Sequence, residues 1–190
     1  MLPRISRISL LIVCLSFASV LATAQQVVHA LVGTVNAINP NAKTIVITTD
    51  DGTKGSFDDL TDSKAHISLD KALRADTTPA LSFTAKDTSA IVLFYGEGAD
   101  RTAVALRDIG VGPFTKSAGV VVNFSGKDHS FSVKDDAGNV EVFKLAPETV
   151  AETRSGAVDG KKFEPGKGEQ VRVTSGLVNG SPTALFVYAN

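Results

Sequence analysis

The stretch that decides the fold is Ser130-Phe131-Ser132-Val133-Lys134, followed at once by Asp135-Asp136-Ala137-Gly138. Phe131 and Val133 alternate with polar residues, which is the period of a strand with one buried face. Gly138 can take the positive φ that a tight hairpin requires, so the residues around it predict a turn. The stretch therefore predicts antiparallel strands joined by hairpins.

A similar stretch lies 86 positions earlier, where Thr44 to Thr49 places Ile45 and Ile47 on one face and Asp50-Asp51-Gly52 predicts a turn. An ungapped shift of 86 pairs Gly33 with Gly119, Val35 with Val121, Ile45 with Phe131, Ile47 with Val133, Asp50 with Asp136, Gly52 with Gly138 and Phe57 with Phe143. Towards the ends of the copies, a shift of 81 pairs Thr102-Ala103-Val104 with Thr183-Ala184-Leu185. Because strand-turn-strand units recur in the same order, the sequence predicts an internal repeat.

The repeat divides the chain into a first copy over residues 25–109, a linker over residues 110–115 and a second copy over residues 116–190. A copy of this size is near the lower limit for a self-sufficient hydrophobic core. The linker is too short to let the copies move far apart. We therefore expect the two copies to pack together or to lie side by side.

Between the third and fourth predicted strands of the first copy, Ser68 precedes Leu69-Asp70-Lys71-Ala72-Leu73-Arg74-Ala75, which predicts a short capped helix. The corresponding residues 148–154 of the second copy are a helix or a loop. Three strands, a short helix or loop, and two more strands are the element order of an OB barrel. The predicted fold is all-β, with two tandem five-stranded OB-like Greek-key barrels, each with a short helix or loop between its third and fourth strands.

Five motifs of the second copy extend over nearly its whole length. They are Gly119-Val120-Val121, Asp135-Asp136-Ala137-Gly138, Thr149, Gly168-Glu169-Gln170-Val171-Arg172-Val173 and Ala184-Leu185-Phe186-Val187. With these motifs the copy resembles a family of uncharacterised exported bacterial domains with an OB-like barrel. The first copy matches at Gly33-Thr34-Val35 and Asp50-Asp51-Gly52, but residues 86–92 lack the expected glycine before the strand. The resemblance implies the fold and the exported setting, and it brings no activity with it.

The amino terminus has the pattern of an export signal. Arg4 and Arg7 precede an uncharged, mostly apolar run from Ile8 to Leu21, and Ala22-Thr23-Ala24 supplies small residues for cleavage. A membrane anchor is the alternative, but a spanning helix needs about 20 apolar residues and this run is shorter. We expect a signal peptide over residues 1–24, cleavage before Gln25, no membrane span after cleavage, and a periplasmic or extracellular protein.

Composition excludes several classes of function for the mature chain. The only cysteine, Cys14, and the only methionine, Met1, lie in the predicted signal, and the chain has no tryptophan. Disulfides, thiolate catalysis and cysteine-ligated zinc are therefore excluded after cleavage. Loss of Arg4 and Arg7 leaves 17 basic and 20 acidic residues, a net charge of −3. That charge argues against nucleic acid as a partner, although OB folds often bind it.

No catalytic, metal-binding or cofactor-binding residue is predicted. The three histidines, His29, His66 and His129, have no ligand-like spacing, and we interpret them as strand or hairpin residues. A mixed metal site, for instance His129 beside Asp128, is the alternative. The paired acids are interpreted as solvated turn residues, and they are Asp50-Asp51, Asp58-Asp59 and Asp135-Asp136.

The remaining candidates are aromatic residues in apolar strands. Phe94 and Tyr95 are neighbours in one predicted strand and must point to opposite faces, so Tyr95 and its counterpart Tyr188 form the candidate ligand surface. The sequence predicts an exported, non-enzymatic binding or interaction module with an unknown envelope protein or glycan as its partner. One alternative is a hydrolase with an unrecognised carboxylate-based site, which convergence of Asp58, Asp59 or His66 in one pocket would favour. The other is a structural component of the envelope, packed by the edges of its strands.

Overall fold

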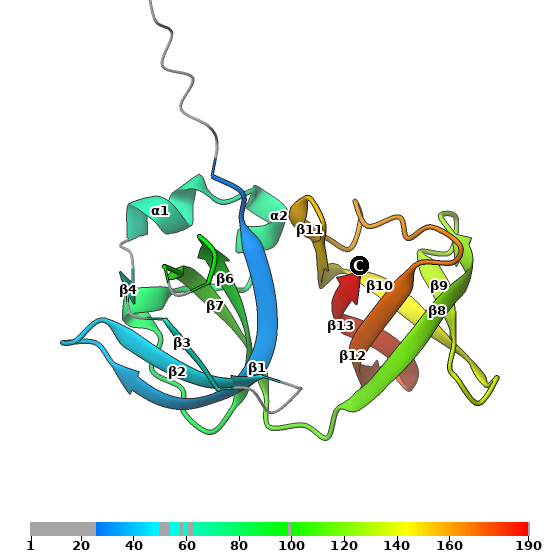
Figure 1. The fold of residues 1–190 in the computed structure, drawn as a ribbon, viewed down its shortest axis with the longest axis horizontal. Coiled ribbons are helices and arrows are strands. Elements are labelled where there is room, and N and C mark those ends of the chain that lie inside the picture. The colour runs from blue at the N-terminus through cyan, green and yellow to red at the C-terminus, as the bar shows by residue number, and fades with distance from the viewer. Residues whose placement is uncertain (1–25, 50–53, 58, 61–62, 99, 190) are drawn as a thin grey trace, which may run out of the picture.

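The computed structural model describes residues 26–49, 54–57, 59–60, 63–98 and 100–189. The fold is all-β, with a closed five-stranded barrel and a second sheet, which confirms the predicted fold class at that level. The two sheets belong to two units that lie side by side (Figure 1), and we call residues 26–110 the first unit and residues 115–189 the second unit. Within the described residues, no helix is long and apolar enough to cross a bilayer.

The first unit holds a sheet in the order β3-β2-β1-β6-β7-β4, with β5 paired to β7. Its strands are β1 (His29–Asn39), β2 (Thr44–Thr49), β3 (Lys54–Phe57), β4 (Asp59–Leu60), β5 (Thr78–Pro79), β6 (Ser89–Tyr95) and β7 (Thr102–Gly110). Its helices are α1 (Ser63–Ser68), α2 (Lys71–Arg74) and the 3-10 helix η1 (Ala80–Ser82). The helices therefore lie in the stretch between β4 and β6, where the sequence predicted a helix.

The second unit contains the closed barrel. Its strands are β8 (Thr115–Ser125), β9 (Ser130–Lys134), β10 (Val140–Thr153), β11 (Gly156–Asp159), β12 (Gln170–Val178) and β13 (Ser181–Ala189). They follow the order β11-β10-β13-β12-β8-β9, and β9 also pairs with β10. This last pairing closes five strands into a ring and leaves only β11 as an edge, so the barrel has no unpaired strand of its own.

Strand registers in the two units agree at two residue offsets, one for β1 and β2 and one for β6 and β7. The facing pairs are Val35 with Ile47 and Val121 with Val133 at the offset of 86, and Val92 with Leu106 and Val173 with Val187 at the offset of 81. The irregularity after Val35 recurs after Val121, and the one after Leu93 recurs after Thr174. These facing pairs and irregularities thus correspond at the two shifts that the sequence predicted.

Gly33 and Gly119, which the shift of 86 pairs, are both places where two backbones approach closely. A Cβ on Gly33 would lie 2.5 Å from the Thr48 carbonyl oxygen, and one on Gly119 would lie 2.2 Å from the Lys134 carbonyl oxygen. No real side chain fits at these distances, so both positions need glycine.

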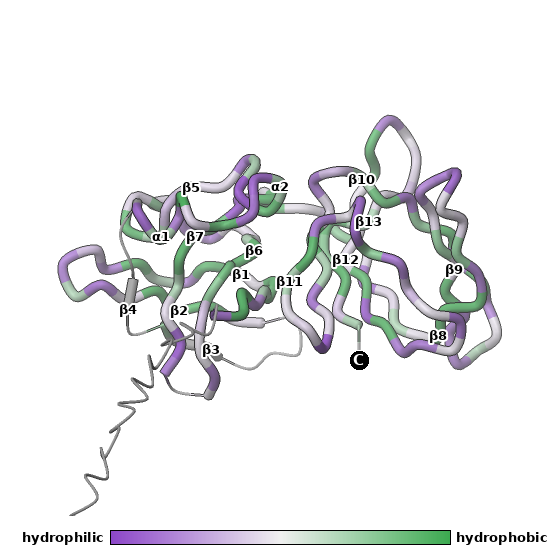
Figure 2. The backbone as a smooth tube through the Cα atoms, turned by 90° about the horizontal axis from the view of Figure 1, so that it is seen from above, coloured by the Kyte–Doolittle hydropathy of each residue, from purple (hydrophilic) through white to green (hydrophobic). Residues whose placement is uncertain are grey.

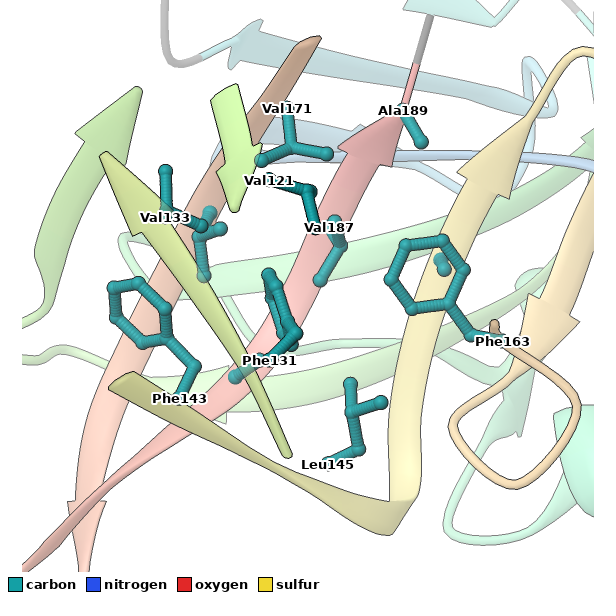
Figure 3. Packing of buried hydrophobic residues seen from close by; sticks show 12 residues of the cluster. Val121, Phe131, Val133, Phe143, Leu145, Phe163, Val171, Val187 and Ala189 are labelled. Atoms are coloured by element: carbon teal, nitrogen blue, oxygen red, sulfur yellow. The ribbon is translucent and has the colours of Figure 1, made fainter. Parts of the chain in front are cut away.

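Each unit has its own hydrophobic core. In the second unit the Phe131 ring lies 5.6 Å from that of Phe143 and 6.0 Å from that of Phe163 (Figure 3). In the first unit Phe57 and Phe94 pack edge to face at 5.3 Å. Hydrophobic and hydrophilic residues alternate along many strands (Figure 2), as expected where one face of a strand is buried.

The turn predicted at Asp136-Ala137-Gly138 is confirmed. Gly138 has a φ of +89° and donates its N–H to the Asp135 carbonyl at 3.0 Å, while Asn139 N–H donates to the Asp135 carboxylate at 2.8 Å. The turn predicted at Asp50-Asp51-Gly52 lies outside the described residues. The predicted linker is shorter than expected, because β7 ends at Gly110 and β8 begins at Thr115.

The helix predictions were wrong in detail. The helix predicted after Ser68 begins two residues later, because Asp70 is its N-cap and accepts the Ala72 N–H at 2.8 Å. Ser68 instead ends α1, and its hydroxyl donates to the Ala65 carbonyl. Residues 148–153, where a helix was an open alternative, belong to strand β10, since Val150 pairs with Phe186 of β13. Pairing with a distant strand overrides local helix propensity here.

A third buried cluster joins the two units. It combines residues of β1, β6, β7 and the helices with Val150 and Phe186 of the second unit. Polar contacts cross the same boundary. The Ala157 N–H donates to the Val28 carbonyl at 2.7 Å, which covers part of edge strand β11, and Lys162 Nζ lies 2.9 Å from the Asp70 carboxylate. The units therefore form a packed pair, as the short linker predicted.

Candidate functional site

A cleft of about 260 Å³ opens where the two units meet. We call it the interunit cleft, and define it by Ala30, Thr49 and Phe94 of the first unit and Glu152, Arg172 and Tyr188 of the second. Its walls are mostly apolar, with a few polar groups set among them. Neither unit alone could form it.

The second unit's wall of the cleft is an ordered row of side chains. Tyr188 of β13 pairs with Glu152 of β10 on one side and with Arg172 of β12 on the other. Paired residues of neighbouring strands point to the same face, so these three side chains share one face of the barrel. Phe186 and Thr174 form part of the next row on that face, and both also line the cleft.

Glu152 is the buried charged group of the cleft, with only 8% of its surface exposed. The His29 Nδ1 atom lies 2.7 Å from Glu152 Oε1, and the Ala30 N–H donates to Oε2 at 2.7 Å. Burial raises the pKa of the Glu152 carboxyl, and the hydrogen bonds from His29 and Ala30 oppose that rise. Both carboxylate oxygens are thus engaged by the first unit.

The raised pKa of the Glu152 carboxyl predicts how the stability of the protein depends on pH. A folded-state pKa above the ordinary value means that the folded chain binds the proton more tightly than the unfolded chain. The wild-type free energy of unfolding should therefore fall, relative to that of Glu152→Gln, as pH rises from the ordinary value of 4.5 through the raised one. Urea unfolding of both proteins from pH 4 to pH 7.5 measures this difference.

The matched control is Glu148→Gln, an exposed glutamate on the same strand. It tests whether loss of any carboxylate changes the dependence of the free energy of unfolding on pH. A difference between wild type and Glu152→Gln that stays constant over the whole pH range contradicts the prediction.

Arg172 is the exposed charged group of the cleft. Its Cζ atom lies 4.7 Å from the centroid of the Tyr188 ring, a cation–π contact that fixes the guanidinium over the aromatic face. In the part of the chain that the structure describes, Arg172 forms no ion pair. Its N–H groups remain available for an anion, because stacking uses the face of the guanidinium and not its edges.

The structure places the two predicted ligand-surface residues in different hollows. Tyr188 lines the interunit cleft, whereas Tyr95 lines a separate, open hollow between the helices and β11, where its hydroxyl lies 3.5 Å from Ser68 Oγ. Both tyrosines pack against the buried cluster between the units. Glu152 and Arg172 were not predicted as site residues. A lone acid after the apolar Val150-Ala151 was the one available signal for Glu152.

The other candidates that the structure describes lie apart from one another. His66 Nε2 lies 2.9 Å from Thr77 Oγ1, and burial, with the nearby Arg74 charge, lowers the pKa of His66. His129 lies in a hairpin turn with a φ of +45°, beside Asp128, which accepts a hydrogen bond from Ser125. Among the residues with a described position, no group of three His, Cys, Asp or Glu could hold a metal ion. Asp50, Asp51 and Asp58 lie outside the described residues.

Comparison with known proteins finds no match for this chain, either among protein-family models or among curated proteins. The chemistry of the interunit cleft is therefore interpreted from its own geometry.

Proposed function

We propose that the protein is a non-enzymatic binding module whose interunit cleft holds a small, largely apolar ligand. The observation that carries the proposal is the cleft itself, with apolar walls and a few polar groups supplied by both units. Concave, mostly apolar sites with a small number of placed polar groups are typical of ligand pockets, and they favour domain interfaces. The separate core in each unit also supports it, because the cleft is not needed to complete either core.

We further propose that the first unit is an OB-like barrel of the same origin as the second. The shared registers at offsets of 86 and 81 support a duplication. Each unit also has a parallel pairing at this place, Leu60 with Ala103 and Leu145 with Ala184, although Leu145 lies one residue from the position that the offset of 86 gives for Leu60. Membership of the exported OB-like family named above stays a proposal on the same grounds.

Export to the periplasm or the cell exterior also stays a proposal. It rests on the signal pattern of residues 1–24, which predicts Gln25 as the first residue of the mature protein. An exported protein that still begins at Met1 would contradict it.

The two alternative functions have less support. A hydrolase needs a carboxyl group that can reach a substrate, yet both oxygens of Glu152 accept hydrogen bonds from His29 and Ala30. A structural component packed by its edges would have to use a terminal strand of the first sheet, such as β3, because part of β11 is covered by Val28 of the first unit. A ligand bound in the cleft, in contrast, would contact both the apolar walls and the few polar groups that line it.

Calorimetric titration with 1-octanol, a neutral eight-carbon ligand, tests the binding function. We expect saturable one-to-one binding with a Kd of about 0.1 to 1 mM, since each buried CH₂ contributes about 0.8 kcal/mol and part of this offsets the freedom lost on binding. Thr49→Trp fills the cleft and should weaken this binding about tenfold or more.

The matched control is Thr44→Trp, which adds the same bulk at a half-buried position at the other end of β2. It should bind 1-octanol as the wild type does. Absence of saturable binding to the wild type, or equal binding by the two tryptophan variants, contradicts the proposed function.

A further inference from the structure

We infer that the interunit cleft selects an amphiphilic anion, with an apolar body of about eight carbon atoms and one carboxylate or similar acidic group that pairs with Arg172. The inference rests on the proposed function and adds the chemical class of the ligand. It concerns the head group of the ligand, whereas the proposed function concerns its apolar body.

Charge gives the first reason. Arg172 is exposed at the cleft, is held over the Tyr188 ring, and forms no ion pair within the described chain. Guanidinium groups bind carboxylates through two parallel N–H donors, and stacking on a ring leaves those donors free. A cation that is positioned but unpaired is suited to an anionic group of a ligand.

The negative charge of Glu152 does not cancel this preference. Tyr188 lies between Glu152 and Arg172 in the row, so the Cα atoms of the two charged residues are two strand spacings apart, about 10 Å. Glu152 is also buried, and His29 and Ala30 occupy both of its oxygens. An anion entering from solvent therefore meets Arg172 first.

Comparison of the two units gives the second reason. At the offset of 81 that relates their registers, Arg172 and Thr174 correspond to Ile91 and Leu93 of the first unit. Ile91 and Leu93 are buried in the cluster between the units, whereas Arg172 and Thr174 line the cleft. The polar character is thus a property of the cleft and not of these strand positions in general.

Size limits the apolar body. A volume of about 260 Å³ has room for roughly nine water-sized groups at about 30 Å³ each. An eight-carbon chain fits this space with its head group at the mouth, beside the exposed guanidinium. Longer chains would extend into solvent.

Three ligands with eight carbon atoms each and different head groups test the inference: octanoate, 1-octanol and octylammonium, titrated at pH 7.5 by calorimetry. The wild type should bind octanoate about tenfold more tightly than 1-octanol, the value expected for a charge-assisted hydrogen bond that is partly exposed to water. Octylammonium should bind more weakly than 1-octanol. Arg172→Gln should abolish the preference, so that octanoate and 1-octanol bind with about equal affinity.

The matched control is Lys127→Gln, which removes one positive charge from the exposed turn between β8 and β9. It should leave the preference for octanoate intact. If the wild type binds 1-octanol and octanoate equally, the inference is overturned while the proposed function stands. If neither ligand binds, both are overturned.

An anionic amphiphile could be a free acid or a lipid in a membrane, so a second arm uses phosphatidylglycerol vesicles. Binding of octanoate without vesicles supports a small free ligand. Arg172-dependent sedimentation with the vesicles, without any binding of octanoate, would overturn the free-ligand inference in favour of a lipid head group.

Discussion

Replacement of Arg107 by alanine is expected to lower the free energy of unfolding by about 3 kcal/mol. Arg107 of β7 is only 6% exposed, and burial lowers the pKa of its guanidinium. The guanidinium donates to the Leu73 carbonyl at 3.3 Å, to the Ala75 carbonyl at 2.7 Å and to the Glu148 carbonyl of the second unit. Alanine would leave all three carbonyls without this partner at the boundary between the units.

Urea unfolding measures this loss, with the exposed Arg154→Ala as the control for the loss of a positive charge. Arg107→Lys should recover only part of the stability, because one ammonium cannot reach three carbonyls in the fixed geometry of a guanidinium. We also expect Arg107→Ala to weaken 1-octanol binding, since the cleft needs both units in place. If Arg107→Ala is as stable as Arg154→Ala, these hydrogen bonds do not hold the units together.

Replacement of Phe131 by alanine is expected to cost about 4 kcal/mol of the free energy of unfolding, the value for a fully buried aromatic side chain. Phe131 is 1% exposed and lies at the centre of the barrel core, against the rings of Phe143 and Phe163 (Figure 3). A closed ring of strands cannot collapse easily around the missing ring, so a cavity remains.

The control for this prediction is Phe124→Ala, because Phe124 is only half-buried and packs at the margin of the same core. It should cost less than half as much. Circular dichroism averages over the whole chain and cannot separate the units, so hydrogen exchange of the β9 and β2 amides is the second measurement. Protection lost equally in both strands would contradict a core that belongs to the second unit alone.

Much of the fold could be predicted from the sequence, because local patterns determine it. Alternation identified the strand containing Phe131 and Val133, and Gly138 identified its turn. The residues 148–153 could not be assigned in the same way, since their conformation depends on pairing with β13, which is more than 30 residues away. Boundaries of the short helices depended on which of two polar residues, Ser68 or Asp70, caps the turn.

The candidate site could be predicted only in part. Tyr188 was expected on a ligand surface and lines the cleft, but Glu152 and Arg172 carried no motif. Their place in the cleft depends on partners that lie far along the chain, since His29 and Glu152, for example, are 123 residues apart. Nothing local in a sequence marks which outward face of a strand will meet another unit.

The contact between the units is heterologous, since β1 of the first unit meets β10, β11 and β13 of the second. At the offset of 86, β8 of the second unit corresponds to β1, and the exposed Lys116 corresponds to the buried Ala30. The two units thus present different surfaces at this position: a small apolar side chain where they meet, and a long charged side chain on the outer side of the second unit.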